Sequence, residues 1–178
     1  MLPIPEGLHI RSQAYGVSGD GSTVVGFGQS ASGTQAYQWD ATNGVQGLGD
    51  LAGGGFSSSA DGVSAGAKII VGGGKSASGL EAFRWDATNR MQGLGDLARG
   101  IFPSEALAVS ADGSTIVGSG VSTSGVKTFI WDSDNRMREI NTVLTALGVD
   151  VTGWTLTQSR SLPRSSRQVV RLRPSTTR

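Results

Sequence analysis

Short runs that alternate small or apolar residues with polar ones recur along this chain, each bounded by Gly, Ser or Asp. The clearest run is VSGDGSTVVG at residues 17–26, and it recurs as VSAGAKIIVG at 63–72 and VSADGSTIVG at 109–118. The copies start 46 residues apart, with no insertion between them. A fixed period of this size is typical of arrays of repeated structural units.

Each period predicts four short antiparallel strands. Asp-Gly turns, as at Asp20-Gly21, join a first strand of small residues to a second strand. The segments 35–39, 81–85 and 127–131 then place two aromatic residues two apart, on one face of a third strand. A second turn, starting at Asp40 in the first period, leads into a short fourth strand. We expect the aromatic strand to be covered by the next repeat along the chain.

Four short strands in 46 residues match the size of a propeller blade. The sequence therefore predicts an all-β fold, an incomplete β-propeller of three four-stranded antiparallel repeats at approximately 8–53, 54–99 and 100–143. The alternative is a β-solenoid with two coils per period, but solenoid coils connect parallel strands and the Asp-Gly hairpins do not. Helical periodicity appears only around 142–147, where we expect a short helix or turn.

The repeated phrases resemble the HAF repeats of bacterial extracellular proteins. The resemblance rests on VSxDGSxxVG, on the aromatic strand (QAYQW, EAFRW and KTFIW), and on GLGDL at 47–51 and 93–97. It covers roughly residues 8 to 160, although the third copy of GLGDL becomes EINTV and the His of the family name is replaced in every copy. The resemblance implies a β-propeller-like array in a secreted, surface-attached or autotransported protein, and it assigns no catalytic role to particular residues.

The charge is unevenly distributed along the chain. Six of the 15 basic residues are arginines in the last 19 positions, so the rest of the chain has nine basic against 14 acidic residues. A nucleic-acid surface on the repeats is therefore not expected.

We expect 144–159 to begin a degenerate closing repeat and 160–178 to be a disordered Arg/Ser-rich tail. A frameshift or a truncated gene near residue 159 would explain this change, and translating the other two reading frames tests it.

The residues needed for catalysis or cofactor binding are scarce. There is no Cys, the only His is His9, and the glycine runs at 53–55 and 72–74 lack the Lys-Ser/Thr of a P-loop. One carboxylate per turn is far from the six to eight oxygens that calcium takes, so we interpret these Asp residues as turn formers. We predict no enzyme, no cofactor and no metal.

The aromatic strands supply the candidate binding residues Trp39, Trp85 and Trp131, which could either pack in a core or stack on sugars. We predict a non-catalytic binding or surface-interaction module, with a structural fragment and a polysaccharide-active enzyme as the alternatives. Its partner would be a glycan or a protein at a cell surface, or a second copy joined through open blade edges.

No apolar run could span a membrane, and residues 1–10 lack the features of a signal peptide. An extracellular location would therefore need a signal outside this chain.

Overall fold

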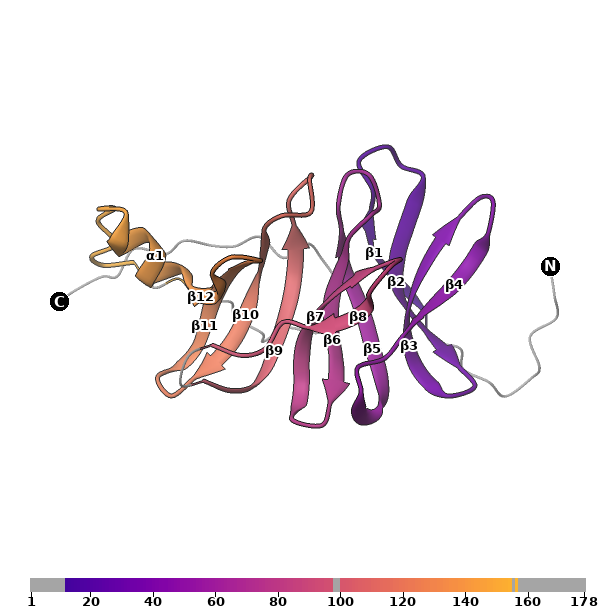
Figure 1. Ribbon diagram of the computed structural model, residues 1–178, viewed down its shortest axis with the longest axis horizontal. Coiled ribbons are helices and arrows are strands. Elements are labelled where there is room, and N and C mark those ends of the chain that lie inside the picture. The colour runs from indigo at the N-terminus through magenta and orange to yellow at the C-terminus, as the bar shows by residue number, and fades with distance from the viewer. Residues whose placement is uncertain (1–11, 98–99, 155, 157–178) are drawn as a thin grey trace.

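The computed structural model describes residues 12–97, 100–154 and 156. These residues form twelve strands and one short helix. The strands fall into three successive up-and-down units of four strands, which we call meanders 1, 2 and 3. A parallel bridge joins meanders 1 and 2 into one eight-stranded sheet, and meander 3 is a separate four-stranded sheet. The meanders lie side by side in chain order, from meander 1 at the right of Figure 1 to meander 3 at the left.

Meander 1 contains β1 (Gln13–Val17), β2 (Thr23–Ser30), β3 (Gly33–Asp40) and β4 (Gly44–Gly49). Meander 2 contains β5 (Gly53–Val63), β6 (Ile70–Ser76), β7 (Gly79–Asp86) and β8 (Arg90–Gly93). Meander 3 contains β9 (Gly100–Val109), β10 (Ile116–Ser122), β11 (Gly125–Asp132) and β12 (Arg136–Glu139). Helix α1 (Ile140–Ala146) follows β12 directly and lies at the far end of the row (Figure 1).

Within each meander, consecutive strands pair antiparallel. This pairing confirms the predicted all-β class and the hairpins, and it rules out the solenoid alternative. The predicted helix or turn around 142–147 is confirmed as α1. A parallel bridge links Thr34 of β3 to Ser57 of β5.

The turn that joins the first two strands of each meander is built by its own side chains. In meander 1, Ser18 and Ser22 donate their hydroxyl protons to the Asp20 carboxylate, and Gly21 takes the left-handed conformation that the turn requires, with φ of 73°. Ser110, Asp112 and Ser114 repeat this arrangement in meander 3. The prediction that these Asp residues form turns is therefore confirmed.

The first strands of successive meanders approach each other closely because they carry small residues. A Cβ added to Gly62 of β5 would lie 3.2 Å from the Cα of Ala108 in β9. One added to Gly16 of β1 would lie 3.5 Å from the Cα of Gly62. The sheets can therefore stack face against face with two apolar cores between them.

Candidate interaction surface

Each core is formed by two different sheet faces. We call one the aromatic face, because it contains the Trp of the third strand, and the other the aliphatic face. Between meanders 1 and 2, Phe83 and Trp85 of meander 2 pack with Val25 and Leu48 of meander 1. Meander 2 therefore contributes its aromatic face and meander 1 its aliphatic face.

The core between meanders 2 and 3 repeats these positions 46 residues further along. Phe129 and Trp131 of the aromatic face of meander 3 pack with Val71 and Leu94 of the aliphatic face of meander 2. Each aromatic face is thus covered by the preceding meander. The expectation that the next repeat covers it was wrong, because both faces of every sheet carry apolar residues and the strand pattern does not determine which neighbour lies on which side.

A serine hydroxyl ties each pair of meanders together. Ser58 accepts the backbone N–H of Ala36 at 3.0 Å and donates to the carbonyl oxygen of Gly49 at 2.8 Å. Ser104 does the same 46 positions later, with Ala82 at 3.0 Å and Gly95 at 3.2 Å. Both serines are buried, and each hydroxyl satisfies two backbone groups of the preceding meander.

The turns after the first strands are also linked. The Gly19 N–H donates to the Ala65 carbonyl oxygen at 3.1 Å, and the Ala65 N–H donates to the Ala111 carbonyl oxygen at 3.1 Å. In both of these turn-to-turn bonds, the N–H group lies in one meander and the carbonyl oxygen in the next. The interface between meanders is therefore directional and has a fixed register.

No meander among the described residues covers the aromatic face of meander 1, which is open. Trp39 is 40% exposed, whereas its counterparts Trp85 and Trp131 are 5% and 7% exposed. Val45 is 70% exposed, although Met137 at the same position of meander 3 is buried. A groove of about 420 Å³ lies on this face; it is lined by Ser12, Val24, Gly28, Gln29, Tyr37, Trp39 and Val45. We call this surface the open aromatic face.

The three predicted binding residues are therefore separated by their position in the row. The rings of Trp85 and Trp131 lie inside the two cores, where a sugar cannot stack on them. A stacking role stays a prediction for Trp39 alone. Sequence reasoning missed Ser12, Tyr37 and Val45, which line the same groove. Counting 46 residues back from a buried aromatic face would have identified all three.

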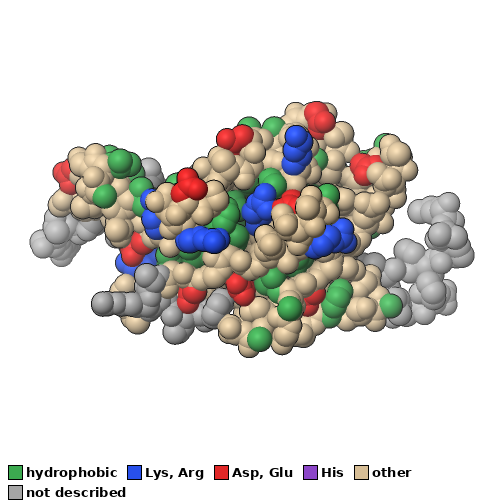
Figure 2. Space-filling model, viewed as in Figure 1, with side chains coloured by type: hydrophobic (Ala, Val, Ile, Leu, Met, Phe, Trp, Pro, Cys, Tyr) green, Lys and Arg blue, Asp and Glu red, His purple; other side chains and the backbone are tan. Residues whose placement is uncertain are grey.

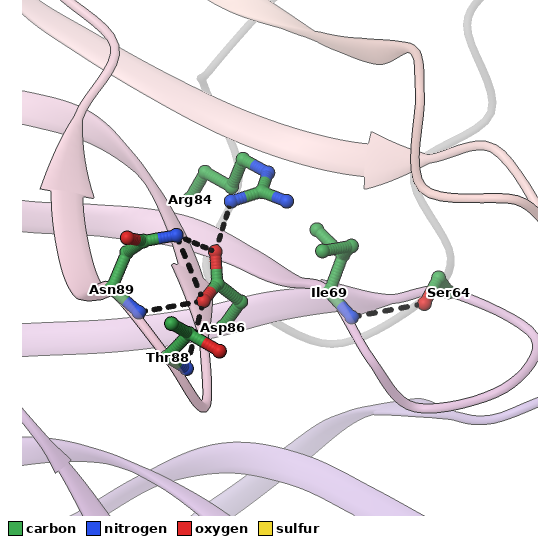
Figure 3. Close-up of polar contacts among 6 residues, drawn as sticks. All are labelled: Ser64, Ile69, Arg84, Asp86, Thr88 and Asn89. Carbon is green, nitrogen blue, oxygen red and sulfur yellow. Dashed lines mark hydrogen bonds and ion pairs between the residues drawn. The ribbon is translucent and has the colours of Figure 1, made fainter.

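The second turns are held by Asp side chains, shown for meander 2 in Figure 3. The Asp86 carboxylate accepts the backbone N–H groups of Thr88 and Asn89 and the Asn89 side-chain amide, and it forms an ion pair with Arg84. These bonds, the largest cause being the Asn89 N–H, lower the pKa of Asp86 to about 2. Arg90, whose guanidinium lies 5.5 Å from the centre of the Trp85 ring, completes the turn.

Other features of the described residues bear on the type of site. On the face drawn in Figure 2, Lys and Arg side chains lie among Asp and Glu side chains. No group of three or more His, Asp or Glu residues in the described ranges is placed so that it could hold a metal ion. Helix α1 is far too short to cross a membrane, and the described part of the chain holds no other helix. His9 and the Arg-rich tail lie outside the described residues.

The stacked antiparallel sheets define an all-β, propeller-like protein. Two solved structures are similar to it: TolB from Acinetobacter baumannii, with 19% identity and a TM-score of 0.53, and a putative TolB from Agrobacterium tumefaciens, with 16% identity and a TM-score of 0.48. TolB is a β-propeller, and the first likeness supports the propeller-like fold.

Both likenesses cover 71% of this chain, but only 31% and 47% of the two TolB chains. The chain thus spans less than half of either of them. No protein-family model matches this chain, and no curated protein does.

Proposed function

We propose that this chain is a non-catalytic protein-interaction module made of three blades of an incomplete β-propeller, and that the open aromatic face is its binding surface. Meanders 1, 2 and 3 are then the blades. The observation that carries the proposal is the exposure of Trp39, which is eight times that of Trp85 at the equivalent position. An exposed apolar patch with a groove is typical of an interaction site.

The repeat itself favours a protein over a sugar as the partner. Tyr37, Trp39, Gln29 and Ser12 could in principle stack on and hydrogen-bond a sugar. However, the same positions in meanders 2 and 3 bury their aromatic rings against aliphatic side chains of another sheet. The aromatic faces of meanders 2 and 3 each pack against another meander. The partner that best fits the aromatic face of meander 1 is therefore also a protein sheet.

Five carboxylates in the turns offer little support for catalysis. The carboxylates of Asp20, Asp40, Asp86, Asp112 and Asp132 all accept hydrogen bonds from their own turns. These bonds lower the pKa of each of them. A general acid needs a raised pKa near the working pH, which is the opposite shift. The resemblance to HAF repeats further supports an exported bacterial protein.

An apolar dye and soluble oligosaccharides test the proposal on the whole chain. At a concentration where the chain is monomeric, we expect 8-anilinonaphthalene-1-sulfonate to bind the folded protein, and Val45→Lys to weaken that binding, because it places a charge in the groove. Phe56→Lys changes an exposed apolar residue outside the groove and serves as the control. Dye binding that Val45→Lys leaves unchanged, or an oligosaccharide that saturably quenches Trp39 in a Trp154→Phe background, would contradict the proposal.

A further inference from the structure

We propose that the partner of the open aromatic face is meander 3 of a second copy of this chain, bound head to tail, so that two copies close one ring of six sheets. This inference rests on the proposed function and names its partner. It follows from the interface that the chain already forms twice, between meanders 1 and 2 and between meanders 2 and 3.

Among the described residues, the aliphatic face of meander 3 is unpaired, as is the aromatic face of meander 1. In meanders 1 and 2, the aliphatic face places Val25 and Val71 at 0% exposure against the following meander. The equivalent residue of meander 3, Val117, is 36% exposed. Ile140 of α1 occupies the position of Leu48 and Leu94, and α1 has no buried residue. Leu156 contacts this face through its carbonyl oxygen at Thr128 but leaves Val117 exposed.

The polar groups at the two ends match in the same register. Gly19 and Ala65 each donate a backbone N–H to the turn of the next meander, so the next donor in the series is the N–H of Ala111. Its acceptor in a second copy would be the Gly19 carbonyl oxygen; both residues are exposed. Likewise Ser12 is the counterpart of Ser58 and Ser104. Its exposed hydroxyl would accept the N–H of Thr128 in the other copy.

The number of copies follows from the number of sheets. A contact between two different faces is heterologous, so it generates either a closed ring or an open filament. Propellers typically have four to eight blades. Each chain contributes three meanders, so six is the only multiple of three within that range. Two copies are therefore expected, joined by two identical contacts.

Light scattering coupled to size exclusion, together with sedimentation over a range of concentrations, tests this inference on the full chain. We expect a species of twice the 18.3 kDa chain mass. Val45→Lys on one face and Val117→Lys on the other should each weaken association by at least about tenfold, because each places a charge in an apolar contact. Phe56→Lys should leave association unchanged. Circular dichroism checks that each variant is folded.

Mixing the two variants separates a head-to-tail contact from a symmetric one. A Val45→Lys chain still has an intact aliphatic face, and a Val117→Lys chain still has an intact aromatic face. One of the two contacts can therefore form in the mixture, and we expect it to associate more tightly than either variant alone. Sensitivity to Val45→Lys without sensitivity to Val117→Lys would instead indicate two aromatic faces in contact, and it would overturn the inference.

The outcomes also separate this inference from the proposed function. A wild-type chain that stays monomeric at every concentration, yet binds the dye through the open aromatic face, would overturn the second copy as partner and leave the proposed function intact. Saturable oligosaccharide binding at Trp39 would overturn both. A single Ser12→Ala variant adds a finer test, since removing the hydroxyl that would accept the N–H of Thr128 in the second copy should weaken association.

Discussion

The Ser104 hydroxyl accepts the backbone N–H of Ala82 at 3.0 Å across the boundary between meanders 2 and 3. Both residues are buried, and Ser104 is 2% exposed. Meanders 2 and 3 belong to separate sheets, and this side-chain hydrogen bond links the two sheets. It therefore contributes to holding two sheets in one register, in addition to the apolar core between them.

We predict that Ser104→Ala lowers the free energy of unfolding by about 1–3 kcal/mol, because it leaves the buried Ala82 N–H without an acceptor. Ser12→Ala removes the equivalent hydroxyl at an exposed position. At a concentration where the chain is monomeric, it should change stability by less than about 0.5 kcal/mol. Urea unfolding followed by circular dichroism measures both. Equal losses for the two variants would mean that the contact between meanders is not the cause.

Much of the architecture could be predicted from the sequence because its causes are local. The Asp-Gly turns, the aromatic third strand and the short helix each depend on residues that are near neighbours in the chain. The packing direction could not be predicted in this way. Adjacent Val24 and Val25 point to opposite faces of β2, so apolar residues occur on both sides of the sheet. Trp39 and Trp85 have the same local sequence pattern, and only their place in the row makes one exposed and the other buried.

Ala67 takes the left-handed conformation with φ of 54°, where Gly21 and Gly113 occupy the equivalent positions of the other turns. An L-residue with a Cβ pays an energetic penalty there of roughly 1–2 kcal/mol, partly offset because Ala restricts the unfolded chain more than Gly. We therefore predict that Ala67→Gly stabilises the fold by up to about 1 kcal/mol in urea unfolding.

Gly21→Ala provides the matched reverse change. Gly21 has φ of 73°, and a Cβ added there meets nothing within 4 Å, so only backbone strain is introduced. It should destabilise the fold by about 1 kcal/mol. Changes of the same sign in both variants would show that backbone conformation does not control the stability of these turns.

Gly72 lies where strands β5 and β6 approach most closely. A Cβ added to it would lie 1.9 Å from the Ser59 carbonyl oxygen, and the equivalent distances are 1.9 Å for Gly26 to Gln13 and 2.1 Å for Gly118 to Glu105. The oxygen belongs to the backbone of a paired strand and cannot move without disrupting the sheet. We predict that Gly72→Ala destabilises the fold by on the order of 2–3 kcal/mol.

Gly66→Ala is the control for this change, because Gly66 is exposed and a Cβ there meets nothing within 4 Å. Its effect on the urea midpoint should stay within about 0.5 kcal/mol. A Gly72→Ala variant as stable as Gly66→Ala would mean that β5 and β6 are further apart than the structure places them.

The turn carboxylates predict how stability depends on pH. Hydrogen bonds from Ser18 to Asp20, from Ser110 to Asp112 and from the Asn89 N–H to Asp86 lower the pKa of all three Asp residues to about 2, from an ordinary value of 3.8. A carboxylate whose pKa is lower in the folded state binds protons more readily when unfolded. Its stabilising contribution is therefore fully present above about pH 4 and is lost as the pH falls toward 2.

We accordingly expect the urea midpoint to be nearly constant from pH 7 to pH 5 and to fall between pH 4 and pH 2. Asp86→Asn keeps the size of the side chain but cannot titrate. It should lower the midpoint at pH 7, since the ion pair with Arg84 is lost, and it should make the decline below pH 4 shallower than in the wild-type protein. A decline of the same steepness in the variant would show that Asp86 does not contribute to the acid sensitivity.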